Sequence, residues 1–345
     1  MTIIAKINDP NIDNIDSFNK IELLSSASPE VTNDLVKLWL LQAKKASSLH
    51  SLYHLTSDNP EARRVSSFQR HQHKEEYIVL MIKSKDSTIV GYIETWILPY
   101  SPTSALDRIA QVQSYYFSNS KIKDQTLRHL MKILRSRVRF MFIRRDIVQT
   151  QDIEMFQNKG FVCVQEQWIQ VDQNLSSSIE PPSSIIIQEA EPDDLPQIVP
   201  IWRDHWNFHK RFHTQFKEIY ALKENADQIW VKNAQDVQNR SSYRCFVAKT
   251  QKGEVIAFAE AYIFPYFSWY KIQNLGFIEA IHVLESYRRQ RIAQSLVRTI
   301  QQKFLTPPLL SGPIMVCIDN RNIPARSFWK SLGFERRQKH LFLKI

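Results

Sequence analysis

Hydrophobic and polar positions follow two periods along the C-terminal part of the chain. The pattern predicts strands at 185–189, 243–249, 255–263, 277–283, 314–318 and 340–344. It predicts helices at 216–231, 289–304 and 323–332, and one that Asp193 or Asp194 caps and that runs through Trp202. This order predicts an α/β (α+β) fold, in which a mixed, mostly antiparallel sheet is flanked by helices.

The same pattern occurs twice. Trp39 matches Trp202, IVGYIETWILPY at 89–100 matches VIAFAEAYIFPY 166 positions later, and two Gly-Phe pairs lie 173 positions apart. Matching stretches in the same order indicate a duplicated unit of roughly domain size. The polar, Ser- and Pro-rich stretch between the copies is typical of a linker. We therefore expect a domain at 1–174, a linker at 175–184 and a domain at 185–345.

Composition narrows the class of protein. The 345 residues are 43% hydrophobic and 23% charged, which is ordinary for a soluble globular protein. No apolar run has the length of a membrane span and no signal peptide is recognisable, so a cytoplasmic protein without a membrane partner is expected. Three cysteines suit neither a disulfide framework nor a zinc site. The net charge of +10 favours an anionic partner of unspecified kind.

Three arginines stand where a strand gives way to a helix. In IEAIHVLESYRRQRIAQSLV the left half alternates like a strand, and the right half has helical spacing. Arg288, Arg289 and Arg291 lie between them, beside a helix N-terminus that already favours anions. A phosphate site explains them, and a solvated basic helix start is the alternative. A nucleic-acid partner is disfavoured, because no basic stripe with interleaved aromatic residues continues along the helix.

The segment RRQRIA resembles the acyl-CoA-binding signature of the GNAT acyltransferase superfamily, and NIPARSFWKSLGFE resembles its second motif. The resemblance covers the second copy and, more faintly, the first, and it implies two tandem GNAT-like domains. It also implies acetyl-CoA as co-substrate, no metal, and a fourth strand that splays from the fifth to admit the pantetheine arm. The implied cofactor-binding residues are Ile281, His282, Val283, Arg288, Arg289, Gln290, Arg291, Ile292, Ala293, Asn322 and Trp329.

Two positions depart from the superfamily pattern. Arg291 stands where glycine is usual, which would weaken cofactor binding if the backbone there has a positive φ; a plain helical conformation is favoured. Trp329 replaces a tyrosine that often protonates the departing thiolate, and an indole N–H cannot act as a general acid. Another group would then protonate the thiolate, or it leaves unaided.

Candidate catalytic residues come from the strand before the arginines. Glu279 is the first candidate for the base that deprotonates the amine, with a solvent-facing strand glutamate as the alternative. His282 is the second, expected on the opposite face of the strand, and Glu260 the third.

The acceptor side is predicted from two further clusters. His205, His209 and His213 have helical spacing, and metal binding, acceptor contact or an ordinary helix surface are all open, the last being favoured. The aromatic loop around Tyr266 would line the acceptor site, pack against the other domain or form a homodimer interface. The predicted substrate-binding residues are His213, Glu260 and Tyr266.

The first copy lacks the cofactor signature. Its counterpart of RRQRIA is IKDQTL, in which Asp124 would repel a phosphate, and Gln149 replaces Asn322. We interpret it as a degenerate, non-catalytic copy that packs against the second or shapes its acceptor pocket.

The sequence thus predicts an acyl-CoA-dependent N-acyltransferase in which a primary amine of a small molecule or peptide attacks the thioester directly. A non-catalytic CoA-binding or protein-interaction module of the same fold is the first alternative. A basic anion- or nucleic-acid-binding protein is the second.

Overall fold

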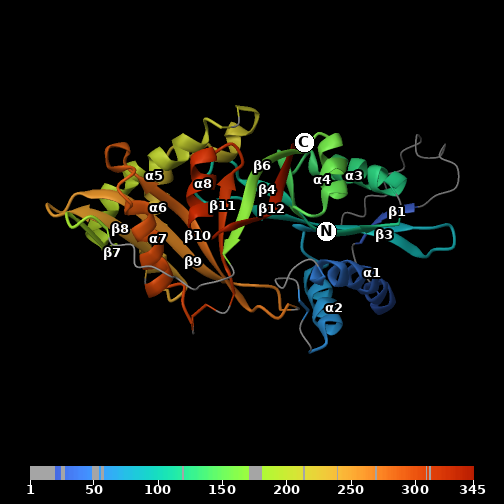
Figure 1. Cartoon of the computed structure of the whole chain (residues 1–345). Helices are drawn as coiled ribbons and strands as arrows, with labels where there is room; N and C mark the ends of the chain where they lie inside the picture. The colour runs from blue at the N-terminus through green and yellow to red at the C-terminus, as the bar shows by residue number, and fades with distance from the viewer. Residues whose placement is uncertain are drawn as a thin grey trace.

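One twelve-stranded sheet runs through the molecule (Figure 1). The computed structural model describes residues 20–24, 28–48, 54–55, 58–118, 120–170, 181–212, 214–238, 240–268, 270–307, 309–310 and 312–345. The strands of the first half are β1 (Lys20–Leu23), β2 (Tyr77–Lys83), β3 (Ile89–Pro99), β4 (Arg108–Phe117), β5 (Phe140–Asp146) and β6 (Val162–Gln170). Those of the second half are β7 (Ile185–Glu189), β8 (Tyr243–Thr250), β9 (Val255–Pro265), β10 (Asn274–Val283), β11 (Ile314–Asp319) and β12 (Glu335–Lys344).

Helices cover both faces of the sheet. In the first half they are α1 (Pro29–Ser47), α2 (Pro60–His71), α3 (Ser120–Leu134) and α4 (Thr150–Asn158). In the second half they are α5 (Leu195–His209), α6 (Ala226–Gln238), α7 (Ile292–Lys303) and α8 (Ile323–Ser331), with the 3-10 segments η2 (Pro192–Asp194), η3 (Thr214–Tyr220) and η4 (Glu285–Tyr287). Among the helices within the described ranges, none is long and apolar enough to span a bilayer.

The order of strands and helices is the same in both halves, as the repeated sequence predicts. Strands β3 and β9 have equal length and begin 166 positions apart, and so do β4 and β10. Within each half most neighbouring strands are antiparallel, and the fourth strand pairs in parallel with the fifth. The predicted mixed, mostly antiparallel sheet flanked by helices is confirmed.

The last strands of the two halves are exchanged, which the sequence did not predict. Strand β12 lies between β5 and β6 and pairs with both, and β6 pairs on its other side with β11. The predicted pair of separate sheets is therefore one continuous sheet, because each half takes the strand that completes its own sheet from the other half.

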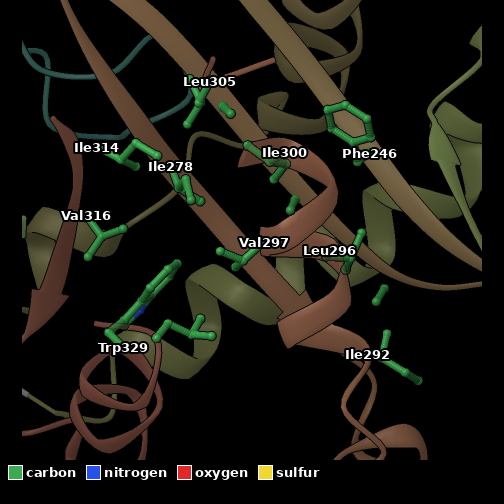
Figure 2. Close-up of a cluster of buried hydrophobic side chains, with 14 of the residues drawn as sticks. Phe246, Ile278, Ile292, Leu296, Val297, Ile300, Leu305, Ile314, Val316 and Trp329 are labelled. Atoms are coloured by element: carbon green, nitrogen blue, oxygen red, sulfur yellow. The ribbon is translucent and has the colours of Figure 1, made fainter. Parts of the chain in front are cut away.

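The helix after the three arginines packs on the sheet by its apolar side (Figure 2). Leu296, Val297 and Ile300 of α7 are fully buried. They pack against residues of β8, β10 and β11, such as Ile278 of β10. Full burial of each such side chain contributes roughly 1.5–3 kcal/mol to stability. The apolar face of α7 is as predicted, although the helix begins at Ile292 rather than at 289.

Candidate functional site

A cleft opens in the second half where two parallel strands separate. Strands β10 and β11 pair only from Gly276–Ile278 to Ile314–Val316, although both continue beyond these residues. A cleft of about 470 Å³ lies where the two strands no longer pair. The structure brings ten of the eleven predicted cofactor-binding residues to its wall: Ile281, His282, Val283, Arg288, Arg289, Arg291, Ile292, Ala293, Asn322 and Trp329. Gln290 does not line the cleft.

The arginine segment bends sharply before the helix begins. Arg289 and Arg291 both have a φ of 63°, in the left-handed region. The expectation that Arg291 is helical is therefore wrong, because it is the N-cap of α7 and turns the chain into the helix. A left-handed conformation costs a non-glycine residue about 1–2 kcal/mol. The two strained residues, Arg289 and Arg291, therefore lie in the segment where three arginines precede the N-terminus of α7.

The first turn of α7 offers backbone donors to an anion. The N–H of Ser295 donates to the Arg291 carbonyl at 3.0 Å and is the first hydrogen bond of the helix. The N–H groups of residues 292–294 come before it and have no acceptor within the helix. Nε of Arg288 donates to the Val283 carbonyl at 3.0 Å, which ties this guanidinium to the end of β10. Backbone N–H groups of a helix N-terminus and nearby guanidinium groups are donors of the kind that can bind phosphate groups.

The opposite wall of the cleft is built by α8. Oδ1 of Asn322 accepts a 3.1 Å hydrogen bond from the backbone N–H of Ala325 and caps the helix, which leaves the side-chain NH2 group of Asn322 as a donor. Trp329 is 5% exposed and packs edge-to-face against Phe334 at 4.8 Å. Trp329 therefore serves both as core and as wall.

A β-bulge changes the side of β10 on which Glu279 lies. Ile278 pairs with Ala261 and Ala280 with Glu260, which leaves Glu279 as the extra residue. Ile278, Ile281 and Val283 contact the core under α7, whereas Ala280 packs under α5. The expected alternation, with Glu279 and His282 on opposite faces, is wrong, because the extra residue shifts the pattern. Both side chains belong to the side of β10 that faces α5.

Glu279 is exposed to the cleft but lies deep within the protein. Burial raises the pKa of its carboxyl group above the ordinary value. Its electrostatic neighbours include Cys317, where burial raises the pKa of the thiol to about 12, and Tyr100 of the first half. Glu279 is thus a carboxylate that water reaches but that accepts protons more readily than a surface glutamate.

Glu260 is a core residue and does not line the cleft, in contrast to its predicted contact with substrate. It is 5% exposed and accepts a 2.9 Å hydrogen bond from the Tyr243 hydroxyl. The same pair recurs 166 positions earlier, where Tyr77 donates to Glu94 at 2.8 Å. A pair kept in the copy without the cofactor signature serves the fold.

Tyr266 lines the corresponding cleft of the first half rather than that of the second. The loop after β9 crosses to the first half because the Lys271 amide donates to the His54 carbonyl at 2.8 Å and Leu55 bridges to Tyr270. Of the alternatives left open for this loop, packing against the other half is the one observed. The prediction that it lines the acceptor side of the second half is wrong.

Two histidines of α5 also line the cleft, whereas the favoured prediction placed them on an ordinary helix surface. His205 and His209 on α5 line the same cleft as Glu279 and His282. Their spacing of four residues was the available signal, but only the structure shows which face of the helix meets the sheet. His213, predicted to bind substrate, lies outside the described residues.

Side chains of the first half contact one another across the part of its cleft that corresponds to the cofactor side of the second half. The Tyr115 hydroxyl on β4 donates to Oδ2 of Asp152 on α4 at 2.8 Å, and the Arg145 guanidinium on β5 lies 4.2 Å from the Tyr115 ring. Lys123 of α3 also pairs with Asp152 at 3.5 Å. These contacts join the strands and helices that stay apart in the second half, and the remaining cavity of about 260 Å³ is smaller.

Comparison with protein-family models matches residues 202–334 to the acetyltransferase (GNAT) family. The match covers the strands and helices that form the cleft of the second half. No curated protein matches the chain in sequence.

Solved structures resemble the whole chain in fold. A GCN5-related N-acetyltransferase from Sphaerobacter thermophilus has a TM-score of 0.59 at 10% identity, over 94% of this chain and 95% of that one. A tandem GNAT protein from the clavulanic acid biosynthesis pathway has a TM-score of 0.53 at 10% identity, over 94% and 98%. A glucosamine N-acetyltransferase region of a fungal β-N-acetylglucosaminidase has a TM-score of 0.54 at 11% identity, over 95% and 38%. At such identities the likeness concerns the fold alone.

Proposed function

We propose that the chain is a tandem GNAT protein and that its second half is an N-acyltransferase that takes the acyl group from acetyl-CoA. The single observation that carries this proposal is the cleft, which combines a strand opening, a helix N-terminus and three arginines. The acceptor is a primary amine of a small molecule or peptide. We assign the boundaries of the two domains to 1–174 and 185–345.

The cofactor enters with its phosphates at the arginine end. The amides of Ile292 and Ala293 and the guanidinium groups of Arg289 and Arg291 bind the pyrophosphate. The pantetheine arm passes between β10 and β11, where the amide N–H groups of Asn322 donate to it. This arrangement brings the thioester to the bulge at Glu279.

The reaction is a direct attack of the amine on the thioester carbonyl. The carboxylate of Glu279 accepts a proton from the ammonium group, and its raised pKa makes it a better base than a surface glutamate. The bulge leaves a residue outside the regular ladder, which makes a backbone N–H available for the oxyanion. His282, the second candidate, lies on the same side of β10 and shares the cleft.

The leaving thiolate does not require Trp329 as an acid. Thiols have a pKa near 8.5, so a thiolate is a good leaving group at neutral pH. The Cys317 thiol, with its raised pKa, stays protonated and forms no acyl-enzyme. The first half, in which Tyr115 contacts Asp152 across the corresponding part of the cleft, carries no second active site.

The proposal is tested by the release of CoA thiol from acetyl-CoA in the presence of ethanolamine, putrescine, glycinamide and a short peptide. Wild-type protein should turn over at least one of these amines. Glu279→Gln should lower kcat by about 100-fold or more and leave acetyl-CoA affinity unchanged. Unchanged turnover in Glu279→Gln removes this residue from the mechanism. Wild-type protein that binds acetyl-CoA without turnover of any amine favours the non-catalytic module.

A further inference from the structure

Three histidines on the acceptor side of the cleft form a row that ends at the surface. The ring centroids of His205 and His209 are 4.7 Å apart, and those of His205 and His282 are 5.8 Å apart. Nε2 of His282 lies 3.0 Å from Oδ2 of Asp204, whose side chain is 52% exposed. All three rings line the cleft, so the row leads from the cleft wall to a carboxylate in contact with water.

The cleft end of the row is also a polar network. The His209 ring stacks on Tyr220 at 5.5 Å, and the Tyr220 hydroxyl donates to Oδ2 of Asp319 at 3.2 Å. Nδ1 of His209 is buried and makes no hydrogen bond within the part of the chain that the structure describes. The titratable and charged groups around the three rings are Asp204, Tyr220, Glu279, Arg288 and Asp319.

The environment keeps the three rings neutral at pH 7. Burial lowers the pKa of His205 well below its ordinary value and that of His209 to about 4. Burial also lowers the pKa of His282, and Asp204 only partly offsets this. A neutral imidazole has one nitrogen that accepts a proton and one that donates, so each ring can pass a proton on.

The duplicated chain provides an internal comparison for this cluster. The positions of His205 and His209 in the first half are occupied by Gln42 and Ala46, which line the cleft of that half. Tyr116 and Leu41 stand in place of His282 and Asp204. The row is thus absent from the half that lacks the arginine segment, whereas the Tyr–Glu pair of the core is present in both.

We propose that His209, His205 and His282 carry the proton lost by the acceptor ammonium out of the cleft to Asp204 and the solvent. This role rests on the transferase function proposed above. Glu279 takes the proton first, and the histidines return it to the carboxylate form for the next turnover. The ring separations are bridged by a small rotation or by one water molecule.

The protons and electrons of the reaction balance along this route. The ammonium group loses one proton to the relay, and its lone pair forms the N–C bond with the thioester carbonyl. When the intermediate collapses, the C–S bond breaks and the thiolate takes the second proton from nitrogen. Each turnover therefore yields amide, CoA thiol and one proton that leaves through Asp204.

The relay is tested with His205→Ala and His209→Ala, assayed for CoA release with the amine that wild-type protein turns over best. We expect kcat to fall about 100-fold, acetyl-CoA affinity to stay within about threefold, and added imidazole to restore part of the rate. Gln42→Ala, at the same helix position in the first half, is the matched control and should retain full activity. Asp204→Asn, a substitution at a half-exposed carboxylate, should lower kcat about tenfold without creating a cavity.

The outcomes separate the relay from the transferase function. If wild-type protein is active and the histidine variants and Asp204→Asn keep kcat within threefold of it, the relay is overturned and the transferase function is not. A loss of rate that imidazole does not restore, together with an unchanged Asp204→Asn, also overturns it, because the histidines then act only in packing. A wild-type protein that turns over none of the amines contradicts both proposals.

Discussion

The hydroxyl of Tyr243 on β8 donates a 2.9 Å hydrogen bond to the carboxyl group of Glu260 on β9, the strand next to the one that carries Glu279. Burial, and secondarily Glu279, raises the pKa of Glu260 to about 7. In the equivalent pair of the first half, Glu94 forms an ion pair with the buried Arg64. Trp230 of α6 takes the place of Arg64 in the second half and supplies a neutral donor. Two copies of one pair thus differ in how the charge is compensated.

The first prediction is that Glu260 makes stability depend on pH. A carboxyl group with a raised pKa binds its proton more tightly in the folded state, so stability falls as the pH rises from about 4.5 to about 7. Glu260→Gln should be more stable than wild type at pH 8, by up to about 3 kcal/mol, and similar to it near pH 4.5. Urea unfolding at both pH values measures the difference.

Glu94→Gln is the control for this prediction. It leaves the buried Arg64 without its carboxylate and should destabilise the protein at pH 8, by about 3–5 kcal/mol. The two variants should therefore change the free energy of unfolding at pH 8 in opposite directions, because the two carboxyl groups differ in how their charge is compensated. An effect of Glu260→Gln that is equal at pH 4.5 and pH 8 contradicts the raised pKa of Glu260.

The second prediction concerns the left-handed arginine at the N-terminus of α7. Arg291→Gly relieves the conformational cost at a φ of 63°, although glycine loses more entropy on folding. The net gain in unfolding free energy should be about 0.5–1 kcal/mol. Arg288→Gly is the matched control and should lower stability, because Arg288 has a φ of −67°. Equal effects of the two substitutions would show that the backbone of Arg291 is not strained.

The third prediction follows from the exchanged strands. A fragment of residues 175–345 lacks β5 and β6, so β11 keeps β10 but loses its other partner, and β12 loses both of its partners. This fragment should not fold as a monomer, whereas mixing it with residues 1–174 should restore the cooperative unfolding of the whole chain. Circular dichroism and gel filtration measure both. A fragment that unfolds cooperatively as a monomer contradicts the exchange.

Much of the fold could be predicted, because it depends on local patterns. The apolar spacing of Leu296, Val297 and Ile300 shows which side of α7 is buried. The match of 89–100 with 255–266 identifies the duplication. The exchange of β6 and β12 could not be predicted, since the pattern within a strand does not determine its distant neighbours.

The site was predicted in part for similar reasons. The arginine segment and Asn322 each directly precede a helix that the sequence pattern predicts, and the structure brings them to one cleft. The side of Glu279 was wrong because one inserted residue shifts alternation, and Glu279–Ala280 carries no turn residue that signals a bulge. The conformation of Arg291 was wrong because arginine is a poor marker for positive φ.

The central claim is that the chain has one cofactor site, in the second half. Isothermal calorimetry with acetyl-CoA at moderate salt should give one site per chain. Arg291→Glu should weaken binding at least tenfold, and Gln125→Glu, at the equivalent position of the first half, should not. Two sites per chain, or weaker binding in Gln125→Glu, would contradict a first half without a cofactor site, and the absence of binding would contradict the assignment of the cleft.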